Sequence, residues 1–316
     1  MVCKKVAPSI TNSIFVATTA GIGKLEGTTW TSFHTGNSAI LSNSVLSIVY
    51  TNGFVYAGTW GQGLFKFDGT DPNNGWTNFN PSISDLQDPD VKDIIALSDG
   101  RIGIATWGNG ISFFDGTSNF GWDRFNRYFS TTNTSDLTRG IVLRMLETSN
   151  GDILVATHKG GLCRFDGISP TGWTFPTVSS SGLPNNSINT FVKDNNTMYF
   201  STTGSGIGSF TDENASDWTI LNYYNSVISS ETITTFSRAD NGFLYTGLNN
   251  KKLVIFDDIN PTTSLSLDDS NSDLPDFLIN SIAHNNGQVY LGLRGGGLAI
   301  FDGISASGWT ILNTTN

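Results

Sequence analysis

Short apolar runs separated by turn residues recur along the whole chain. The clearest copy has apolar or aromatic stretches at 41–48, 54–59, 64–67 and 75–79. These stretches are rich in aromatic and β-branched residues, which favour strands. Gly, Asn and Asp lie between them and supply the backbone conformations that turns need. The pattern predicts a unit of four short antiparallel strands that repeats every 44 to 51 residues.

A tryptophan in the fourth predicted strand marks the period. The series is Trp30, Trp76, Trp122, Trp173, Trp218, Leu265 in the next expected place, and Trp309; its first four spacings are 46, 46, 51 and 45 residues. Seven four-stranded units at this period predict an all-β fold, a seven-bladed β-propeller formed as a single domain. The expected blades are 1–37, 38–83, 84–132, 133–179, 180–222, 223–270 and 271–316.

Further motifs in the repeat carry a family resemblance. Phe-Asp-Gly follows the third strand at 67–69, 114–116, 165–167 and 301–303, and the stretch 183–188 reads Leu-Pro-Asn-Asn-Ser-Ile before a Gly-Thr step and a Gly-Gly-Leu. The chain resembles the two-component-regulator propeller repeat over essentially its whole length. That resemblance implies a sensor-like domain of the kind found in periplasmic parts of hybrid two-component systems, many of which respond to glycan fragments. We expect no kinase or regulator segment after Asn316, and therefore only the binding half of that function here.

The first blade departs from the pattern. Its inner strand falls at about 2–9, where Lys4 and Lys5 replace apolar residues and Pro8 cannot donate a backbone hydrogen bond. We therefore expect either a poorly paired inner strand or a three-stranded first blade, and the least stable junction of the ring at this point.

Composition narrows the class of partner. The 316 residues are 38% hydrophobic and 14% charged, with 35 glycines and a formal net charge of −10. Nucleic acid and anionic membrane surfaces are unfavourable partners for such a chain, and no apolar run is long enough to insert into a membrane. We expect no signal peptide in the first residues as they stand, so that either the protein is made without one or the sequence starts on a trimmed chain. Cys3 and Cys163 fall in blades 1 and 4, so we expect small apolar cysteines and no disulfide.

The turns between the second and third strands are the candidate site. The residue after the second strand differs from blade to blade on a repeated scaffold, as expected of a binding surface. The seven residues are Thr19, Trp60, Trp107, His158, Thr203, Asn249 and Arg294, and Lys159 adds a donor beside His158. Trp60 and Trp107 lie on neighbouring blades between glycines. We expect a flat platform of exposed indoles suited to a sugar face or a protein partner; the alternative is that both rings fold inward and fill the axial channel.

The sequence offers only weak candidates for a metal site or a catalytic site. The repeated Asp-Gly pairs are turn devices, and none has the spacing of a calcium loop, so we expect no metal and no cofactor. Some propellers of this appearance are lyases that use histidine and a metal, but His34, His158 and His284 fall too far apart to share a proton or a metal.

The sequence therefore predicts a non-catalytic binding propeller for a glycan or polar ligand. It leaves the location open, although the composition favours a place outside the cell, on its surface or in a virion. Two alternatives stay open. One is a structural component of an extracellular or virion assembly, and the other is a lyase-type enzyme.

Overall fold

The structure is a computed structural model of the whole chain. It describes residues 3–9, 13–125, 141–158, 160–167, 173–174, 187–194, 197–211, 219–221, 228, 232–239, 241–257, 264–285 and 287–313. These residues form seven four-stranded antiparallel blades arranged as a β-propeller, which confirms the predicted fold class. No helix occurs within these ranges, and so none that is long and apolar enough to cross a membrane.

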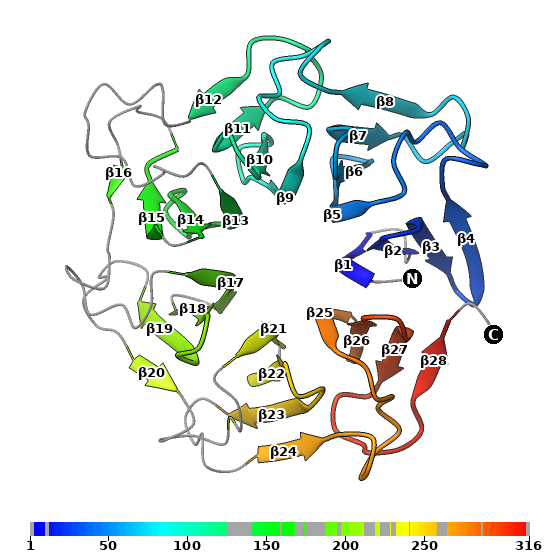
Figure 1. The fold of residues 1–316 in the computed structure, drawn as a ribbon, viewed down its shortest axis with the longest axis vertical. Coiled ribbons are helices and arrows are strands. Elements are labelled where there is room, and N and C mark those ends of the chain that lie inside the picture. The colour runs from blue at the N-terminus through cyan, green and yellow to red at the C-terminus, as the bar shows by residue number, and fades with distance from the viewer. Residues whose placement is uncertain are drawn as a thin grey trace. The chain divides into compact units, whose positions relative to one another are not determined.

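The first four blades contain sixteen strands, labelled in Figure 1. Their bounds are β1 Cys3–Pro8, β2 Ser13–Thr18, β3 Gly21–Glu26 and β4 Thr29–Phe33; β5 Val45–Thr51, β6 Phe54–Thr59, β7 Leu64–Phe67 and β8 Trp76–Phe79; β9 Val91–Ala96, β10 Ile102–Thr106, β11 Ile111–Phe114 and β12 Asp123–Phe125; β13 Val142–Glu147, β14 Ile153–Thr157, β15 Gly161–Phe165 and β16 Trp173–Thr174.

The last three blades repeat the same order. Their bounds are β17 Ile188–Asp194, β18 Thr197–Thr202, β19 Ile207–Thr211 and β20 Thr219–Leu221; β21 Ile233–Arg238, β22 Phe243–Leu248, β23 Leu253–Asp257 and β24 Ser264–Leu267; β25 Ile279–Asn285, β26 Gln288–Leu293, β27 Gly297–Phe301 and β28 Thr310–Leu312. We call the four strands of each blade A to D in chain order.

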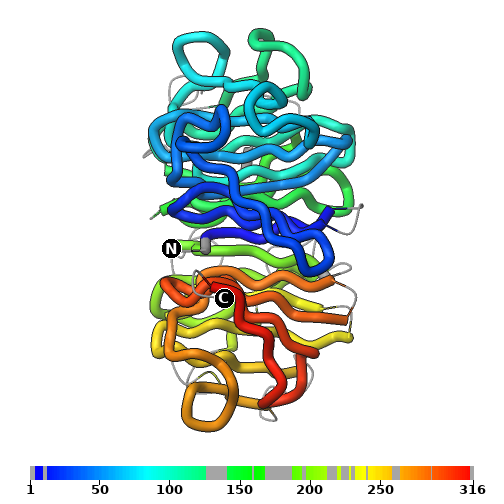
Figure 2. The backbone as a smooth tube through the Cα atoms, turned by 90° about the vertical axis from the view of Figure 1, so that its right-hand side faces the viewer, coloured from blue at the N-terminus to red at the C-terminus, as the bar shows by residue number. Residues whose placement is uncertain are grey.

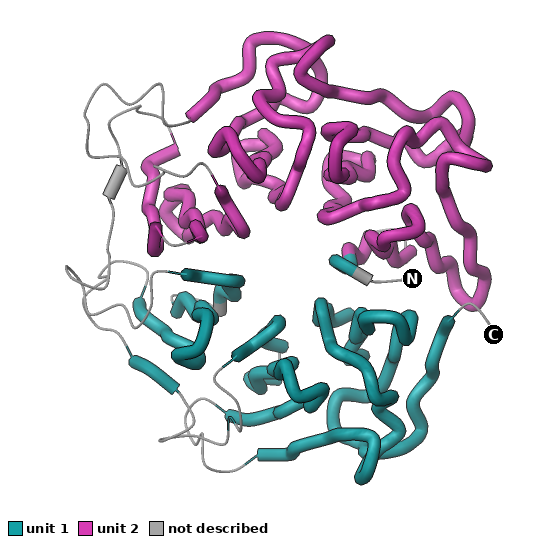
Figure 3. The backbone as a smooth tube through the Cα atoms, in the orientation of Figure 1, with its two compact units in different colours: residues 1–6, 176–316 teal, residues 7–175 magenta. Residues whose placement is uncertain are grey.

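The chain divides into two compact units, one of residues 7–175 and one of residues 1–6 with 176–316 (Figure 3). Within each unit, the antiparallel strands run back and forth between two ends where the turns lie (Figure 2). The A–B and C–D turns therefore lie at one end of a blade, and the B–C turns lie at the other.

The hydrophobic core of each unit lies between consecutive blades. Tyr56, Leu64 and Phe79 of blade 2 pack with Ile94 and Phe114 of blade 3, and all five are almost fully buried. The same arrangement joins blades 1 and 2, 3 and 4, 5 and 6, and 6 and 7. Because burying one such side chain contributes about 1.5–3 kcal/mol, each blade depends on its neighbours for stability.

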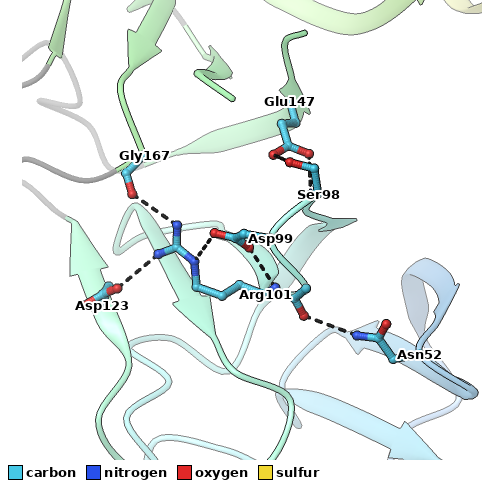
Figure 4. A network of polar contacts seen from close by, with 8 residues as sticks. Asn52, Ser98, Asp99, Arg101, Asp123, Glu147 and Gly167 are labelled. Atoms are coloured by element: carbon cyan, nitrogen blue, oxygen red, sulfur yellow. Dashed lines mark hydrogen bonds and ion pairs between the residues drawn. The ribbon is translucent and has the colours of Figure 1, made fainter. Parts of the chain in front are cut away.

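Polar contacts join consecutive blades at the end that carries the A–B and C–D turns. Arg101 of blade 3 donates to the carbonyl of Gly167 in blade 4 over 3.3 Å and pairs with Asp99 and Asp123 of its own blade (Figure 4). Glu147 of β13 accepts hydrogen bonds from the Ser98 amide and hydroxyl, each 2.7 Å long. This network fixes blade 4 against blade 3.

The Asp-Gly turns receive the same kind of contact in other blades. The Lys66 ammonium donates to the Gly116 carbonyl over 2.7 Å, and the Tyr245 hydroxyl donates to the Gly303 carbonyl over 3.0 Å. Gly116 has φ +83°, a conformation that glycine adopts at low cost and that turns its carbonyl toward the preceding blade. The repeated motif is therefore a point of attachment between blades.

The predicted series of fourth-strand tryptophans needs one correction. Trp30, Trp76 and Trp173 face Leu25, Phe67 and Phe165 across the C and D strands, which is the same register in three blades. Leu265 is not in that register, because Phe256 faces Ser264 and Leu265 faces Ile255. The prediction for Leu265 was wrong by one residue. Ser264 occupies the position of the tryptophan, and the residue spacing alone does not show this. Trp218 lies outside the described residues.

Blade 1 has four strands, so the three-stranded alternative is wrong. Its sheet has the order β1-β2-β3-β4. Val6 and Ala7 are buried, and Pro8 is the exposed last residue of β1. A proline at the end of a strand leaves the interior ladder intact, which explains why this segment can pair. The stability of the junction stays a prediction.

Candidate functional site

One backbone hydrogen bond fixes the B–C turn in six blades. The amide of Trp60 donates to the Ser44 carbonyl over 2.9 Å, and the amide of Trp107 donates to the Asp90 carbonyl over 3.0 Å. The corresponding bonds in blades 4 to 7 are His158 to Ile141, Thr203 to Ser187, Asn249 to Thr232 and Arg294 to Leu278. Since the bond uses only main-chain atoms, the side chain at this position is free to vary without changing the turn.

Blade 1 does not share this turn. The Thr18 hydroxyl donates to the Gly21 carbonyl, three residues on, whereas the Thr59 hydroxyl of blade 2 donates to the Gly63 carbonyl, four residues on. The turn that carries Thr19 is therefore one residue shorter than the turn that carries Trp60, and Thr19 is not an equivalent position.

Trp60 and Trp107 form a contacting pair of exposed indoles. Their ring centroids are 5.7 Å apart and their planes meet at 64°. Trp60 is 47% exposed and Trp107 is 38% exposed, so neither ring is folded into the interior. The sequence placed them side by side, but a flat platform is not what they form. The two rings make an edge-to-face corner, an arrangement that the aromatic quadrupoles favour.

The loop before β9 and the start of β9 place polar groups against the turns that carry this corner. Asp90 accepts a 2.6 Å hydrogen bond from the Gly61 amide in the turn of Trp60. Asp88 accepts from the Asn109 side chain, in the turn of Trp107, over 3.1 Å. The Lys92 ammonium lies 5.0 Å from the centre of the Trp107 ring, within cation–π range. Asp88, Asp90 and Lys92 were not identified from the sequence.

Lys92 reaches the indole because β9 contains a bulge. The pairing of β9 with β10 shifts between Val91 and Asp93, so that both of these residues are buried and Lys92 between them is partly exposed. The inner strands of five other blades shift at the same point. The bulged residues are Leu46, Lys92, Leu143, Asn189, Thr234 and Asn280. Such a residue leaves the alternation of the strand, which is why the hydrophobic pattern does not identify it.

The other predicted residues are distributed as follows. His158 is half-buried in the same unit as the tryptophans, and Lys159 lies outside the described residues. Thr203, Asn249 and Arg294 are exposed residues of the other unit. There, the Thr203 hydroxyl donates to the Asn189 side chain over 3.1 Å. Thr203 therefore contacts the bulged residue of its own blade, as Trp107 contacts Lys92. Their role in binding stays a prediction.

The repeated aspartates act within their own turns. Asp115 accepts hydrogen bonds from the amides of Ser118 and Thr117, which hold the pKa of its carboxyl below the ordinary value. Asp302 accepts hydrogen bonds from the Ser305 hydroxyl and from the amides of Ser305 and Ile304, which likewise lower the pKa of its carboxyl. In the described ranges, no three His, Cys, Asp or Glu side chains are grouped so that they could hold a metal ion.

The histidines lie in separate surroundings. His34 accepts a hydrogen bond from the Gly36 amide through Nδ1 over 3.0 Å, His158 occupies the B–C turn of blade 4, and His284 packs beside Tyr245 with ring centroids 4.9 Å apart. Cys163 is fully buried among apolar residues of blades 3 and 4.

No protein-family model matches the chain, and no curated protein sequence is similar to it. Solved structures are similar in fold. The extracellular domain of the hybrid two-component system BT3049 from B. thetaiotaomicron has a TM-score of 0.77 at 17% identity, over 95% of this chain and 39% of that one. YCF48 from Cyanidioschyzon merolae has a TM-score of 0.68 at 13% identity, over 95% and 94%. Virginiamycin B lyase from Staphylococcus aureus has a TM-score of 0.61 at 14% identity, over 83% and 82%.

These similarities confirm the resemblance to sensor-system propellers at the level of the fold. The chain spans about two fifths of the BT3049 domain, so it corresponds to one part of that larger protein. The similar structures also include a peptide-bound protein and a lyase, which means that the fold alone does not select a function.

Proposed function

We propose that this chain is a non-catalytic, extracellular or cell-surface binding propeller that recognises a glycan at Trp60 and Trp107. The observation that carries the proposal is the pair of exposed, contacting indoles on two backbone-fixed turns. The similarity to extracellular domains of two-component systems supports a ligand-binding role.

The corner geometry suits a sugar ring. A pyranose has an apolar face of C–H groups and an edge of hydroxyls, and an indole stacks against the face while polar groups bind the edge. Here Trp60 and Trp107 supply apolar faces, and Asp90 and Lys92 lie beside them as an acceptor and a donor. Because the B–C turns are fixed by main-chain hydrogen bonds, little ordering is needed when a ligand binds.

The test is a glycan array followed by titration calorimetry on the best ligand. Trp60→Ala and Trp107→Ala should each weaken binding about thirtyfold, as expected when an aromatic anchor is removed, and the double variant should abolish it. Trp30→Ala is the matched control, because Trp30 is 41% exposed but belongs to the outer strand of blade 1. The Trp30→Ala variant should bind the ligand with the affinity of the wild type. Unchanged binding in the double variant would refute the proposed site.

The alternative of a structural component in an assembly has its own observation. Ile83 and Phe120 are 45% and 65% exposed, and the Asn119 side chain donates to the Ile83 carbonyl over 3.1 Å, which keeps the two apolar residues close. A protein-binding role through this patch predicts that Phe120→Ser changes assembly but leaves glycan binding intact. For the lyase alternative, the described residues contain no group of three His, Cys, Asp or Glu side chains that could hold a metal ion.

A further inference from the structure

Asp90 and Lys92 place opposite charges on the two sides of the tryptophan pair. They flank Val91, which is fully buried at the start of β9. The Asp90 carboxylate points to the turn of Trp60, where it accepts the Gly61 amide, whereas the Lys92 ammonium lies over Trp107. Asp90 thus contacts the B–C turn of Trp60, and Lys92 contacts the ring of Trp107.

Asp90 has one carboxylate oxygen left for a ligand. Its Oδ1 accepts the Gly61 amide, and no hydrogen bond to its Oδ2 comes from any residue in the described ranges. Asp88, the neighbouring acid, differs in this respect. Its Oδ1 accepts the Asp90 amide over 2.9 Å, and its Oδ2 accepts the Asn109 side chain. Asp88 is therefore a structural residue of the loop, and Asp90 is the acceptor beside the indoles.

Lys92 is held in position by buried neighbours. Asp93 is 1% exposed; its carboxylate accepts the Ser47 hydroxyl of blade 2 and the Met145 amide of blade 4, each over 3.0 Å. With Val91 and Asp93 both anchored, the bulge directs Lys92 out of the strand, and its ammonium lies over the Trp107 ring. The fold thus sets the point from which the Lys92 side chain leaves β9.

We infer that Asp90 and Lys92 are the specificity-determining residues of this site and select an uncharged pyranose with adjacent hydroxyls. The inference rests on the proposed function. A neutral sugar can donate one hydroxyl to Asp90 and accept at the next from Lys92. A sugar carboxylate or ammonium placed across the pair meets one like and one opposite charge, so attraction and repulsion offset each other while the higher cost of dehydrating an ion remains.

The experiment uses three oligosaccharides, one each of the gluco, galacto and manno series. Each is compared in three forms: the neutral chain, its 6-carboxylate and its 2-amino form. The wild type should bind a neutral form at least about tenfold more tightly than both charged forms. Asp90→Asn keeps an oxygen for the Gly61 amide and should shift the preference about tenfold toward the carboxylate. Lys92→Gln should shift it by a similar factor toward the amino form.

Charge-matched controls are Asp276→Asn and Lys251→Gln, an exposed ion pair in the other unit that changes the net charge by the same amounts. These should leave the preference unchanged, and melting temperatures should show that all four variants are folded. If the wild type binds none of the sugars, the proposed function fails. If it binds a charged form best, or if neither site variant shifts the preference, the function stands and this inference is overturned.

Discussion

At the start of three outer strands, or one residue before it, a tryptophan stacks on a phenylalanine. In the B–C turns of blades 2 and 3, by contrast, two tryptophans meet each other edge to face. The stacked pairs are Phe67–Trp76, Phe114–Trp122 and Phe301–Trp309, with centroids 4.1–4.4 Å apart and planes within 28°. The indole nitrogens of Trp122 and Trp309 donate to the carbonyls of Ser118 and Ser305, each over 2.8 Å. Trp60 and Trp107 meet at 64° and remain exposed.

The difference shows what fixes each region. Trp122 and Trp309 each stack on a phenylalanine and donate the hydrogen bond that closes the C–D loop. Trp76 stacks in the same way, but its indole nitrogen has no hydrogen-bond partner among the described residues. This packing explains why the residue recurs from blade to blade. In the B–C turns the main chain closes the loop, and the side chain at the tip changes from tryptophan to histidine, threonine, asparagine and arginine. Constancy therefore indicates a structural task here, and variation on a fixed turn indicates a surface open to function.

The comparison is tested most strongly by truncating one tryptophan from each region. Trp122→Ala should lower the free energy of unfolding by about 3–5 kcal/mol, because Trp122 is 6% exposed and packs on Phe79 and Phe114. Trp107→Ala should cost less than about 1 kcal/mol, as for an exposed residue. Urea denaturation of both variants measures the two values. Similar losses of unfolding free energy in the two variants would mean that Trp107 stabilises the fold as Trp122 does.

A smaller effect is expected at the polar network in Figure 4. Arg101→Ala removes one contact to the Gly167 carbonyl and two to carboxylates, and we expect a loss of about 1–2 kcal/mol with glycan affinity unchanged. Lys251→Ala, which breaks an ion pair between two well-exposed groups, is the control and should cost at most about 1 kcal/mol. A weaker ligand affinity in Arg101→Ala would show that the two ends of the blades are coupled.

The smallest effect concerns acid pH. The Lys252 ammonium and the Ser270 hydroxyl and amide lower the pKa of Asp268 to about 2, and turn hydrogen bonds also lower the pKa values of Asp68, Asp115 and Asp302. Because these folded-state values lie below the unfolded ones, the stabilisation is complete above about pH 4 and is lost as the pH falls toward about 2. The melting temperature should fall across this window, and Asp268→Asn should flatten the curve. An equally steep curve in that variant would assign the acid sensitivity to other groups.

Much of the fold was predictable because it depends on short-range chemistry. The strand and turn pattern of one unit, repeated at a fixed period, predicts seven four-stranded blades and places the residue after the second strand correctly in blades 2 to 7. The same reasoning failed at Leu265, where the spacing rule missed the strand pairing by one residue, and at Thr19, whose turn is one residue shorter than that of Trp60. Of the two alternatives for blade 1, the three-stranded one was wrong, because Pro8 is the last residue of β1.

The candidate site was only half predictable. Trp60 and Trp107 follow from their place in the repeat, and their adjacency follows from consecutive blades. Their 64° angle does not, and neither do Asp90 and Lys92. Lys92 is an ordinary charged residue in the sequence, and nothing local indicates that its strand bulges at that position.

By itself the sequence determined the fold class, the number of blades and which residues stand at the turns, because each of these depends on neighbours along one unit of the chain. The tertiary structure alone decided which side chains share a site. Asp93 is buried by contacts with Ser47 and Met145, about fifty residues away on either side, and those contacts orient the bulge that brings Lys92 to Trp107. Contacts at that separation exist only once three blades have packed together.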